Sequence, residues 1–366
     1  MKRFDVLFLI ALFIFPNLIC GCAKLSPISN TQTISTSLPT ATQSTIPQTA
    51  IPIPPAIPTA ILTEMGRAEV GSSINDLTFS PDGKTIAVAG EKGITLFEVI
   101  NLKPRWSQPS TQAVNSISFS PDGFTLASGA DDKEVKLWET SSGSRLRVLT
   151  GFQDWVGGVA FSPKDELLAV GSFQTITLWD TQSWKILHTL KGHTGYLWHL
   201  SFSTDSKLLA STSVDQTIAL WDIQTVLSAK KGKEKAARVL RGSTYWVRSA
   251  AFSPDGKQIA AGSGDGNVYL WDVHSGKRIF TLRGHSGYVW QVAFSPDGKT
   301  LASASDDQRV IFWDMQKGQA EHQIETPSSA HSLTFSPDKE YLGIGLADGS
   351  LILYQLPANE QREQLK

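Results

Sequence analysis

FSPDGKT stands at residues 79–85 and again, letter for letter, at residues 294–300. Within it, the proline presets φ at about −65° and the glycine tolerates a positive φ, so Ser-Pro-Asp-Gly predicts a tight turn. Apolar runs rich in β-forming residues flank the first copy, INDLTF before it and TIAVAG after it. Two such runs around a turn indicate a β-hairpin.

Weaker copies of this hairpin recur along the chain at a nearly constant interval. A phenylalanine precedes each turn, at Phe79, Phe119, Phe161, Phe202, Phe252, Phe294 and Phe335. The spacings between them are 40, 42, 41, 50, 42 and 41 residues. A constant period of this length indicates one supersecondary unit in each repeat.

The repeats also end alike. Five end in Trp followed by Asp or Glu, in KLWET, TLWDT, ALWDI, YLWDV and IFWDM, and the first and last end in TLFEV and LILYQ. Gly-His pairs stand between repeats in KGHTG and RGHSG. Over residues 63–357 the chain therefore resembles the WD40 repeat family, which implies an all-β, seven-bladed propeller with four antiparallel strands per blade.

The physics of a single repeat favours the same architecture. A lone four-stranded sheet cannot bury both of its faces, whereas sheets stacked in a ring bury them against their neighbours. The last repeat lacks a fourth strand, and the segment at about Thr63–Val70 has no blade of its own. We expect this segment to supply the missing outer strand and close the ring, with residues 358–366 as a C-terminal tail.

Composition excludes several classes of function. The net charge is −1, so a nucleic-acid-binding surface is not expected. The histidines are scattered and no glycine-rich loop precedes a helix, which predicts neither a metal site nor any other cofactor. Both cysteines lie near the N-terminus, outside the repeats. We expect a monomeric propeller without disulfides.

The N-terminus is similar to a bacterial lipoprotein signal peptide. A positively charged start precedes an apolar run at residues 6–15, which is too short to span a bilayer comfortably. In the motif Ile19-Cys20-Gly21-Cys22, only Cys22 follows a small residue. The resemblance implies that residues 1–21 are removed and that Cys22 is lipidated. An uncleaved signal anchor is the alternative.

Residues 22–62 read as a lipidated cysteine followed by a tether. Residues 23–62 hold seven prolines, thirteen Ser or Thr and one charged residue, a composition that cannot bury enough apolar area to fold. The protein is therefore expected to be exported and anchored by lipid to the bacterial cell membrane or outer membrane. The propeller is then expected on the extracytoplasmic side.

Two repeats contain a set of residues that invites a hydrolase interpretation. One set is His193, Ser211 or Ser213, Asp215 and Trp221, and the other is His285, Ser303 or Ser305, Asp307 and Trp313. In WD40 proteins these positions resemble a structural tetrad that is hydrogen-bonded within a blade. Since a catalytic site should occur once and not recur around a ring, we expect no catalysis. The third repeat has Phe152 in place of the histidine, and the fifth has Ser243.

Variation between repeats is concentrated at two positions of the first strand, and the resemblance to WD40 proteins implies that both point towards one face. The start of the first strand and the turn after the second strand share a face, here called the top face. Counted back from each repeat's phenylalanine, positions −5 and −2 are always apolar and are expected in the core. Position −6 reads Ser73, Ala113, Trp155, Tyr196, Trp246, Tyr288 and Ser329. Position −4 reads Asn75, Asn115, Gly157, Trp198, Arg248, Trp290 and His331.

Aromatic residues with an arginine among them are typical of binding hot spots. We therefore predict a partner-binding site at Trp155, Tyr196, Trp198, Trp246, Arg248, Tyr288, Trp290 and His331. Asp131 and Asp306 are expected to line the same face and to accept a basic group. The leading hypothesis is a scaffold that binds a protein or peptide, and a glycan-binding module with the same aromatics is the alternative. Packing of these rings on neighbouring blades is a further alternative, and a propeller hydrolase is the least favoured.

The fourth repeat carries extra residues after its Trp-Asp motif. The segment 226–240 is basic, with Lys230, Lys231, Lys233, Lys235 and Arg238. It is expected to join the third and fourth strands on the face opposite the top. Contact with anionic lipid or a partner is one interpretation, and a solvated loop is the simpler one.

Overall fold

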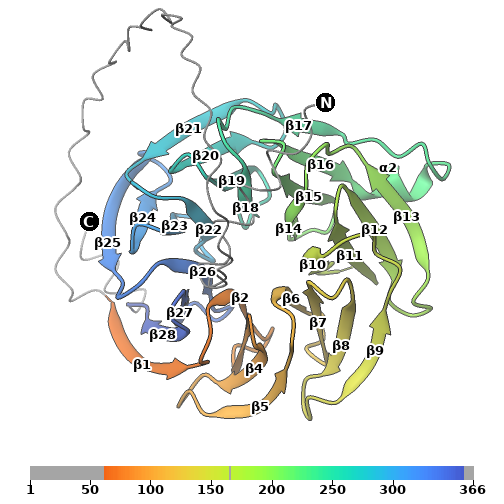
Figure 1. Cartoon of the computed structure of the whole chain (residues 1–366). Coiled ribbons are helices and arrows are strands. Elements are labelled where there is room, and N and C mark those ends of the chain that lie inside the picture. Colours follow the sequence, from red (N-terminus) through yellow and green to blue (C-terminus); the bar gives the residue numbers. More distant parts are fainter. Residues whose placement is uncertain (1–61, 165, 358–366) are drawn as a thin grey trace, which may run out of the picture. The chain divides into compact units, whose positions relative to one another are not determined.

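The computed structural model describes residues 62–164 and 166–357, all within one compact unit. The predicted signal peptide, Cys22 and all but the last residue of the tether lie outside the described residues, as does the predicted C-terminal tail. The described chain forms seven four-stranded antiparallel sheets. Figure 1 shows these sheets arranged as blades around a common axis. The predicted seven-bladed propeller is confirmed.

Each blade runs from an inner first strand to an outer fourth strand (Figure 1). The first strands are β2 (Ile74–Phe79), β6 (Val114–Phe119), β10 (Val156–Phe161), β14 (Leu197–Phe202), β18 (Val247–Phe252), β22 (Val289–Phe294) and β26 (Ala330–Phe335). The second strands are β3 (Thr85–Gly90), β7 (Thr125–Ala130), β11 (Leu167–Ser172), β15 (Leu208–Ser213), β19 (Gln258–Ser263), β23 (Thr300–Ser305) and β27 (Tyr341–Leu346).

The third strands are β4 (Gly93–Glu98), β8 (Val135–Glu139), β12 (Thr175–Asp180), β16 (Ile218–Asp222), β20 (Asn267–Asp272), β24 (Arg309–Asp314) and β28 (Ser350–Gln355). The fourth strands of blades one to six are β5 (Pro104–Pro109), β9 (Arg145–Leu149), β13 (Ile186–Lys191), β17 (Arg238–Leu240), β21 (Arg278–Arg283) and β25 (Gln319–Glu325). A short helix, α2 (Ile223–Ser228), follows β16.

The N-terminal strand closes the ring. β1 (Thr63–Glu69) pairs antiparallel with β28 and becomes the fourth strand of blade seven, as predicted. Its side chains are mostly exposed, so it is held chiefly by backbone pairing. Because the first and last strands of the described chain share one sheet, no blade of the ring lacks its outer strand.

The repeated Ser-Pro-Asp-Gly turn builds its own hydrogen-bond network. In the first blade, Ser80 Oγ donates to Asp82 Oδ1 at 2.6 Å, and the N–H of Thr85 donates to Ser80 Oγ at 3.0 Å. Gly83 closes the turn with φ of +71°, a conformation that favours glycine. Ser295 and Asp297 repeat the serine–aspartate bond in the sixth blade. This recurring geometry explains the two identical heptads.

The core lies between neighbouring blades. Positions −5 and −2 are buried in every blade, as Ile74 and Leu77 show in the first. This spacing of three departs from the period of two that a regular strand requires. The cause is a bulge, since the register shifts between positions −5 and −3 of every first strand.

Polar side chains at position −3 bind neighbouring first strands together. Asp76 Oδ2 accepts a hydrogen bond from the N–H of Ile117 at 2.9 Å. Ser116 Oγ likewise accepts from Val159 in the next blade, at 3.2 Å, and Ser249 Oγ accepts from Val292, at 3.1 Å. The innermost strands are therefore fixed at the axis by direct bonds across the blade boundaries, in addition to the apolar core.

Candidate functional site

A recurring backbone hydrogen bond organises the top face. In six blades, the N–H of a residue in the turn after the second strand donates to the carbonyl of the residue at position −6. The pairs are Glu91–Ser73, Asp131–Ala113, Val214–Tyr196, Gly264–Trp246, Asp306–Tyr288 and Ala347–Ser329. The side chains at position −6 therefore lie beside these turns, at the end of the blades where the first strands begin.

The aromatic side chains of blades three and four are in contact on this face. Trp155 stacks on Tyr196 with ring centroids 5.5 Å apart and an interplanar angle of 10°. Trp155 also contacts Trp198, with centroids 5.1 Å apart, and Phe173 meets the edge of Tyr196 at 5.2 Å. The hydroxyl of Tyr196 lies 3.4 Å from the carboxylate of Asp154.

The ring contacts continue into blades five to seven. Trp246 contacts Trp198 at 6.5 Å, Tyr288 at 5.3 Å and Trp290 at 5.7 Å between centroids. Trp290 then contacts His331 in blade seven at 4.8 Å. The seven predicted ring residues thus form one connected aromatic cluster, and all of them are partly exposed.

Arg248 lies inside this cluster, between the tryptophans of the two flanking blades. Its guanidinium carbon is 4.6 Å from the centroid of Trp198 and 5.7 Å from that of Trp290. Contacts of a cation with indole faces are attractive, and more so where water is excluded. Burial lowers the pKa of Arg248 to about 10, so its side chain remains charged at neutral pH.

Several polar atoms of this region have no hydrogen-bond partner among the described residues. They are Nε1 of Trp198, Nε1 of Trp290, Nε of Arg248 and Nδ1 of His199, and all four are shielded from solvent. An indole N–H and a guanidinium N–H can only donate. Three donors in one aromatic cluster therefore lack an acceptor from the described chain.

The remaining ionisable groups near Arg248 are one acid and two histidines. Burial raises the pKa of Asp76 to about 6, and the backbone N–H groups of Leu77 and Ile117 both donate to its carboxylate. Burial lowers the pKa of His199 and of His331 to about 4. At pH 7 both histidines are neutral, and the charged groups that act on this region are Arg248, Asp76 and, beside His331, Asp306.

The two predicted acids of the top face lie at the turns, outside the ring contacts. Asp131 is half-buried and accepts a hydrogen bond from Asn115 Nδ2 at 2.8 Å. Burial raises the pKa of Asp131. Asp306 is exposed in the turn that binds the carbonyl of Tyr288.

Sequence reasoning missed some members of the aromatic cluster. Tyr245, which is 42% exposed, stacks on Tyr288 with centroids 6.3 Å apart and an interplanar angle of 2°. It stands at position −7, one residue before the positions that were compared. Phe173, which follows the second strand of blade three, also lies outside positions −6 and −4. Asp76 could have been identified from the sequence, because it is the one acidic residue at position −3 of the first strands.

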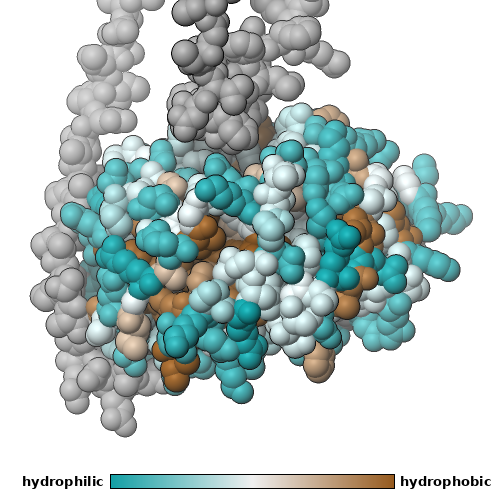
Figure 2. Space-filling model, turned by 60° about the horizontal axis from the view of Figure 1, so that its bottom comes forward, coloured by the Kyte–Doolittle hydropathy of each residue, from teal (hydrophilic) through white to brown (hydrophobic). Residues whose placement is uncertain are grey.

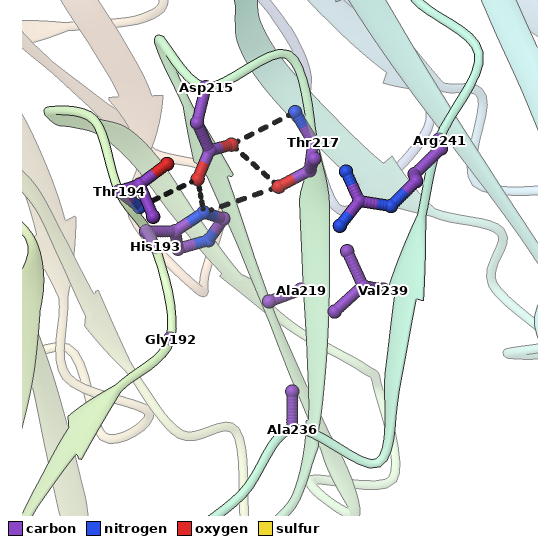
Figure 3. Close-up of a pocket in the computed structure, with 9 residues that line it drawn as sticks. All are labelled: Gly192, His193, Thr194, Asp215, Thr217, Ala219, Ala236, Val239 and Arg241. Atoms are coloured by element: carbon purple, nitrogen blue, oxygen red, sulfur yellow. Dashed lines mark hydrogen bonds and ion pairs between the residues drawn. The ribbon is translucent and has the colours of Figure 1, made fainter.

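The polar set of blade four forms a hydrogen-bond network, of which Figure 3 shows the part around His193 and Asp215. His193 Nδ1 lies 2.8 Å from Asp215 Oδ2, and His193 Nε2 lies 2.8 Å from Ser211 Oγ. Trp221 Nε1 donates a hydrogen bond to Ser211 Oγ at 3.0 Å. Although burial alone raises the pKa of Asp215, hydrogen bonds from His193 and Thr217 hold it below the usual range. Ser211, not Ser213, is therefore the serine of this set. A small cavity of about 100 Å³ adjoins it.

Blade six repeats this network. His285 Nδ1 lies 3.1 Å from both oxygens of Asp307, and Nε2 lies 2.7 Å from Ser303 Oγ. Trp313 Nε1 donates to the same hydroxyl at 2.8 Å. Every polar atom of the histidine and of the serine is engaged within the blade, so neither serine is free to act as a nucleophile.

The basic segment 226–240 joins the third and fourth strands of blade four, as predicted. Val226 is buried beside blade three, and Glu234 accepts a hydrogen bond from His188 Nδ1 at 2.7 Å. Arg238 donates to the backbone carbonyls of His274 and Ser275 in blade five. The four lysines are exposed. The segment is thus anchored to both neighbouring blades, with its lysines in solvent.

The described chain contains neither a metal cluster nor a membrane-spanning helix. Within residues 62–164 and 166–357, no cluster of three or more His, Cys, Asp or Glu could hold a metal ion. The same residues contain no helix with the length and apolar character needed to cross a membrane.

Comparison with known proteins gives short matches to repeat proteins. Nuclear distribution protein PAC1 of Mycosarcoma maydis is 45% identical over 42 residues, 12% of this chain and 9% of that protein. Lissencephaly-1 homolog 1 of Paramecium tetraurelia is 32% identical over 91 residues, 25% of this chain and 22% of that protein. An uncharacterized WD repeat-containing protein of Synechocystis sp. is 33% identical over 96 residues, 26% of this chain and 28% of that protein. The chain thus spans less than a third of each of these relatives.

The match to a protein family is far more extensive. The WD40 family model (WD domain, G-beta repeat) matches residues 67–97, 103–139, 143–180, 184–222, 234–272 and 276–314. These six segments make up more than half of the chain and correspond to six of the seven repeats. Together with the seven blades, they show that this chain belongs to the WD40 repeat family.

Proposed function

We propose that this protein is a scaffold that binds a protein or peptide through the aromatic cluster of its top face. WD40 propellers are typically platforms for protein–protein interaction. The observation that supports this site is the connected set of partly exposed rings that surrounds Arg248. Tryptophan, tyrosine and arginine are the residues most enriched in binding hot spots.

The rest of the surface offers no comparable cluster among the described residues. Other large apolar side chains that are exposed include Ile100 (85%) and Phe124 (73%), which lie in turns on the face opposite the top. In the view of Figure 2, most of the visible surface is hydrophilic and hydrophobic residues appear in separate patches. Single exposed apolar residues are ordinary, whereas a contiguous aromatic group with an embedded cation favours recognition.

The experiment is a capture of partners from a cell-envelope extract with the full chain. The variant Trp155→Ala with Trp246→Ala removes two rings of the cluster, and Ile100→Ala with Phe124→Ala removes two exposed apolar residues elsewhere. We expect a protein that binds the wild-type chain and the second variant but not the first. Equal binding by both variants would refute the site, and displacement by soluble carbohydrate would assign the rings to a glycan.

We further propose that the protein is exported and anchored to the membrane through lipid on Cys22. The support is the signal-like sequence of residues 1–22, which lies outside the described residues. Cells that express the chain should incorporate labelled palmitate into it. Cys22→Ser should abolish this label and Cys20→Ser should retain it, whereas the reverse result would assign the lipid to Cys20.

The proposal includes no catalysis. The two Ser–His–Asp sets are engaged within their blades by hydrogen bonds of 2.7 to 3.1 Å. A nucleophile needs a hydroxyl that can approach a substrate, and the hydroxyls of Ser211 and Ser303 are fully buried.

A further inference from the structure

The environment of Arg248 restricts where its hydrogen bonds can go. Trp198 and Trp290 lie against the guanidinium from the two flanking blades. None of the described residues accepts a hydrogen bond from its Nε, although the side chain keeps some exposure to solvent. A buried cation without a hydrogen-bonded counter-ion is costly for a protein. Any acceptor for Nε of Arg248 must therefore come from outside the described chain.

Asp76 does not supply that acceptor. Its charge acts on Arg248 through space, but its carboxylate is engaged by the backbone of its own strand and of blade two. That geometry is fixed by the strands, because Asp76 joins two neighbouring blades. The two nearby histidines are neutral at pH 7 and present no negative charge.

The chemistry of the unpartnered atoms defines the missing group. Nε1 of Trp198, Nε1 of Trp290 and Nε of Arg248 are all donors, so the group must carry several acceptor positions. The positive charge of Arg248 favours an anion, and a guanidinium binds a planar carboxylate with two parallel bonds. A doubly charged phosphate would meet stronger repulsion from Asp76 than a singly charged carboxylate would.

We infer that Trp198, Arg248 and Trp290 form a recognition site for a carboxylate of the peptide partner. The carboxylate is either the C-terminus of the partner or an Asp or Glu side chain. This inference rests on the proposed function, because it names the group that the top face selects. Because the indole nitrogens are shielded from solvent, binding requires the surrounding rings to move aside.

Three short peptides serve as probes of the full chain. They are acetyl-Gly-Leu-Phe with a free C-terminus, the same peptide as its C-terminal amide, and the amide of acetyl-Gly-Glu-Phe. Binding is followed by NMR of the indole N–H signals, with Trp198→Phe and Trp290→Phe identifying the two signals of interest. We expect a free carboxylate to improve affinity by roughly tenfold or more over the neutral amide. The third peptide distinguishes a terminal from a side-chain carboxylate.

Arg248→Gln should remove this preference, bringing the acids and the amide to within about twofold of one another. Arg241→Gln is the matched control, since it removes the charge of an exposed arginine away from the cluster. If Arg248→Gln fails to fold, Arg248→Lys retains the charge without the planar fork and should keep only part of the preference. A preference that survives both changes at Arg248 would overturn the inference.

The remaining outcomes separate this inference from the proposed function. The peptides with a carboxylate and the neutral amide could bind the wild-type chain equally well, and the double variant Trp155→Ala with Trp246→Ala could weaken the binding of all of them. In that case the carboxylate site is wrong and the peptide-binding face stands. If no probe shifts either indole signal, the carboxylate site is overturned. The envelope capture then decides the proposed function independently.

Discussion

The strongest test of blade architecture is the change His285→Phe. This substitution copies blade three, where Phe152 takes the place of the histidine and packs on Trp179 with ring centroids 6.2 Å apart. Burial lowers the pKa of His285, so the ring is neutral at pH 7. Only the tautomer with the proton on Nδ1 then satisfies both neighbours, because Asp307 must accept and Ser303 can donate.

The expected cost follows from the bonds that are lost. The bond to the carboxylate of Asp307 is charge-assisted and contributes about 1.5–3 kcal/mol, and the bond to Ser303 contributes about 1 kcal/mol. Two features limit the loss. Asp307 keeps Ser286 N–H at 2.9 Å and Arg309 at 2.6 Å, and the hydroxyl of Ser303 can turn to the carbonyl of Ile311 at 3.4 Å. We expect the free energy of unfolding to fall by about 3 kcal/mol.

Thermal unfolding followed by near-UV circular dichroism measures this loss, which should lower Tm by roughly 6 °C. The matched control is His274→Phe, the same exchange at an exposed histidine, and it should leave Tm within about 1 °C. An unchanged Tm for His285→Phe would refute the view that the network stabilises its blade. An equal loss in both variants would point to the added phenylalanine instead.

Two further predictions concern the blade seams. A Cβ on Gly345 would lie 2.5 Å from Ile74 Cγ2, whereas a Cβ on Gly171, at the same place in blade three, meets only ordinary contacts of 3.5 Å. Gly345→Ala should therefore lower the free energy of unfolding, measured in urea, by about 1–3 kcal/mol. Gly171→Ala is the control and should be neutral or slightly stabilising. Equal effects of the two substitutions would contradict the packing argument. Burial raises the pKa of Asp76 to about 6, so the folded state favours the protonated carboxyl group. The resulting contribution to the free energy of unfolding is complete below the unfolded pKa and is lost as pH rises through 6. The free energy of unfolding of Asp76→Ser, which copies Ser116, should therefore rise by about 3 kcal/mol relative to that of the wild-type chain between about pH 3 and pH 7. Parallel pH profiles of the two proteins would refute this.

The sequence predicted the ring well because every blade obeys the same local rules. The turn residues, the apolar positions and the period are each visible in one dimension, and seven copies reinforce one another. The closing strand β1 was also predictable, because the seventh repeat lacked a partner that only the N-terminal segment could supply. None of these inferences required knowledge of a side-chain conformation.

The candidate site was predictable in composition but not in contacts. Positions −6 and −4 identified most of the rings, yet position −7 was not compared and Tyr245 was missed. The placement of Arg248 between two tryptophans depends on three rotamers in three blades, which sequence spacing does not encode. The bulge between positions −5 and −3 is equally hidden, although the burial of both −5 and −2 was its signature.

Position −4 shows how the same place in the fold is used differently around the ring. In blades one and two it holds Asn75 and Asn115, whose amides donate to the carbonyls of Val114 and Val156 in the next blade. In blades four to six it holds two tryptophans and an arginine, and the indole Nε1 and guanidinium Nε atoms have no acceptor in the described chain. Each shielded donor without a partner costs about 1–3 kcal/mol.

Stability of the fold alone would favour asparagine at position −4 of every blade. The asparagine side-chain amide donates a hydrogen bond to the next blade, so its donor does not lack an acceptor. Blades three to seven all lack this asparagine, and in blades four to six the replacing side chains meet one another at a single place. A random loss of structural bonds would not gather three donors without an acceptor in consecutive blades. Their convergence on Arg248 is what a requirement for binding would produce, and it supports the proposed recognition at the top face independently of the exposure of the rings.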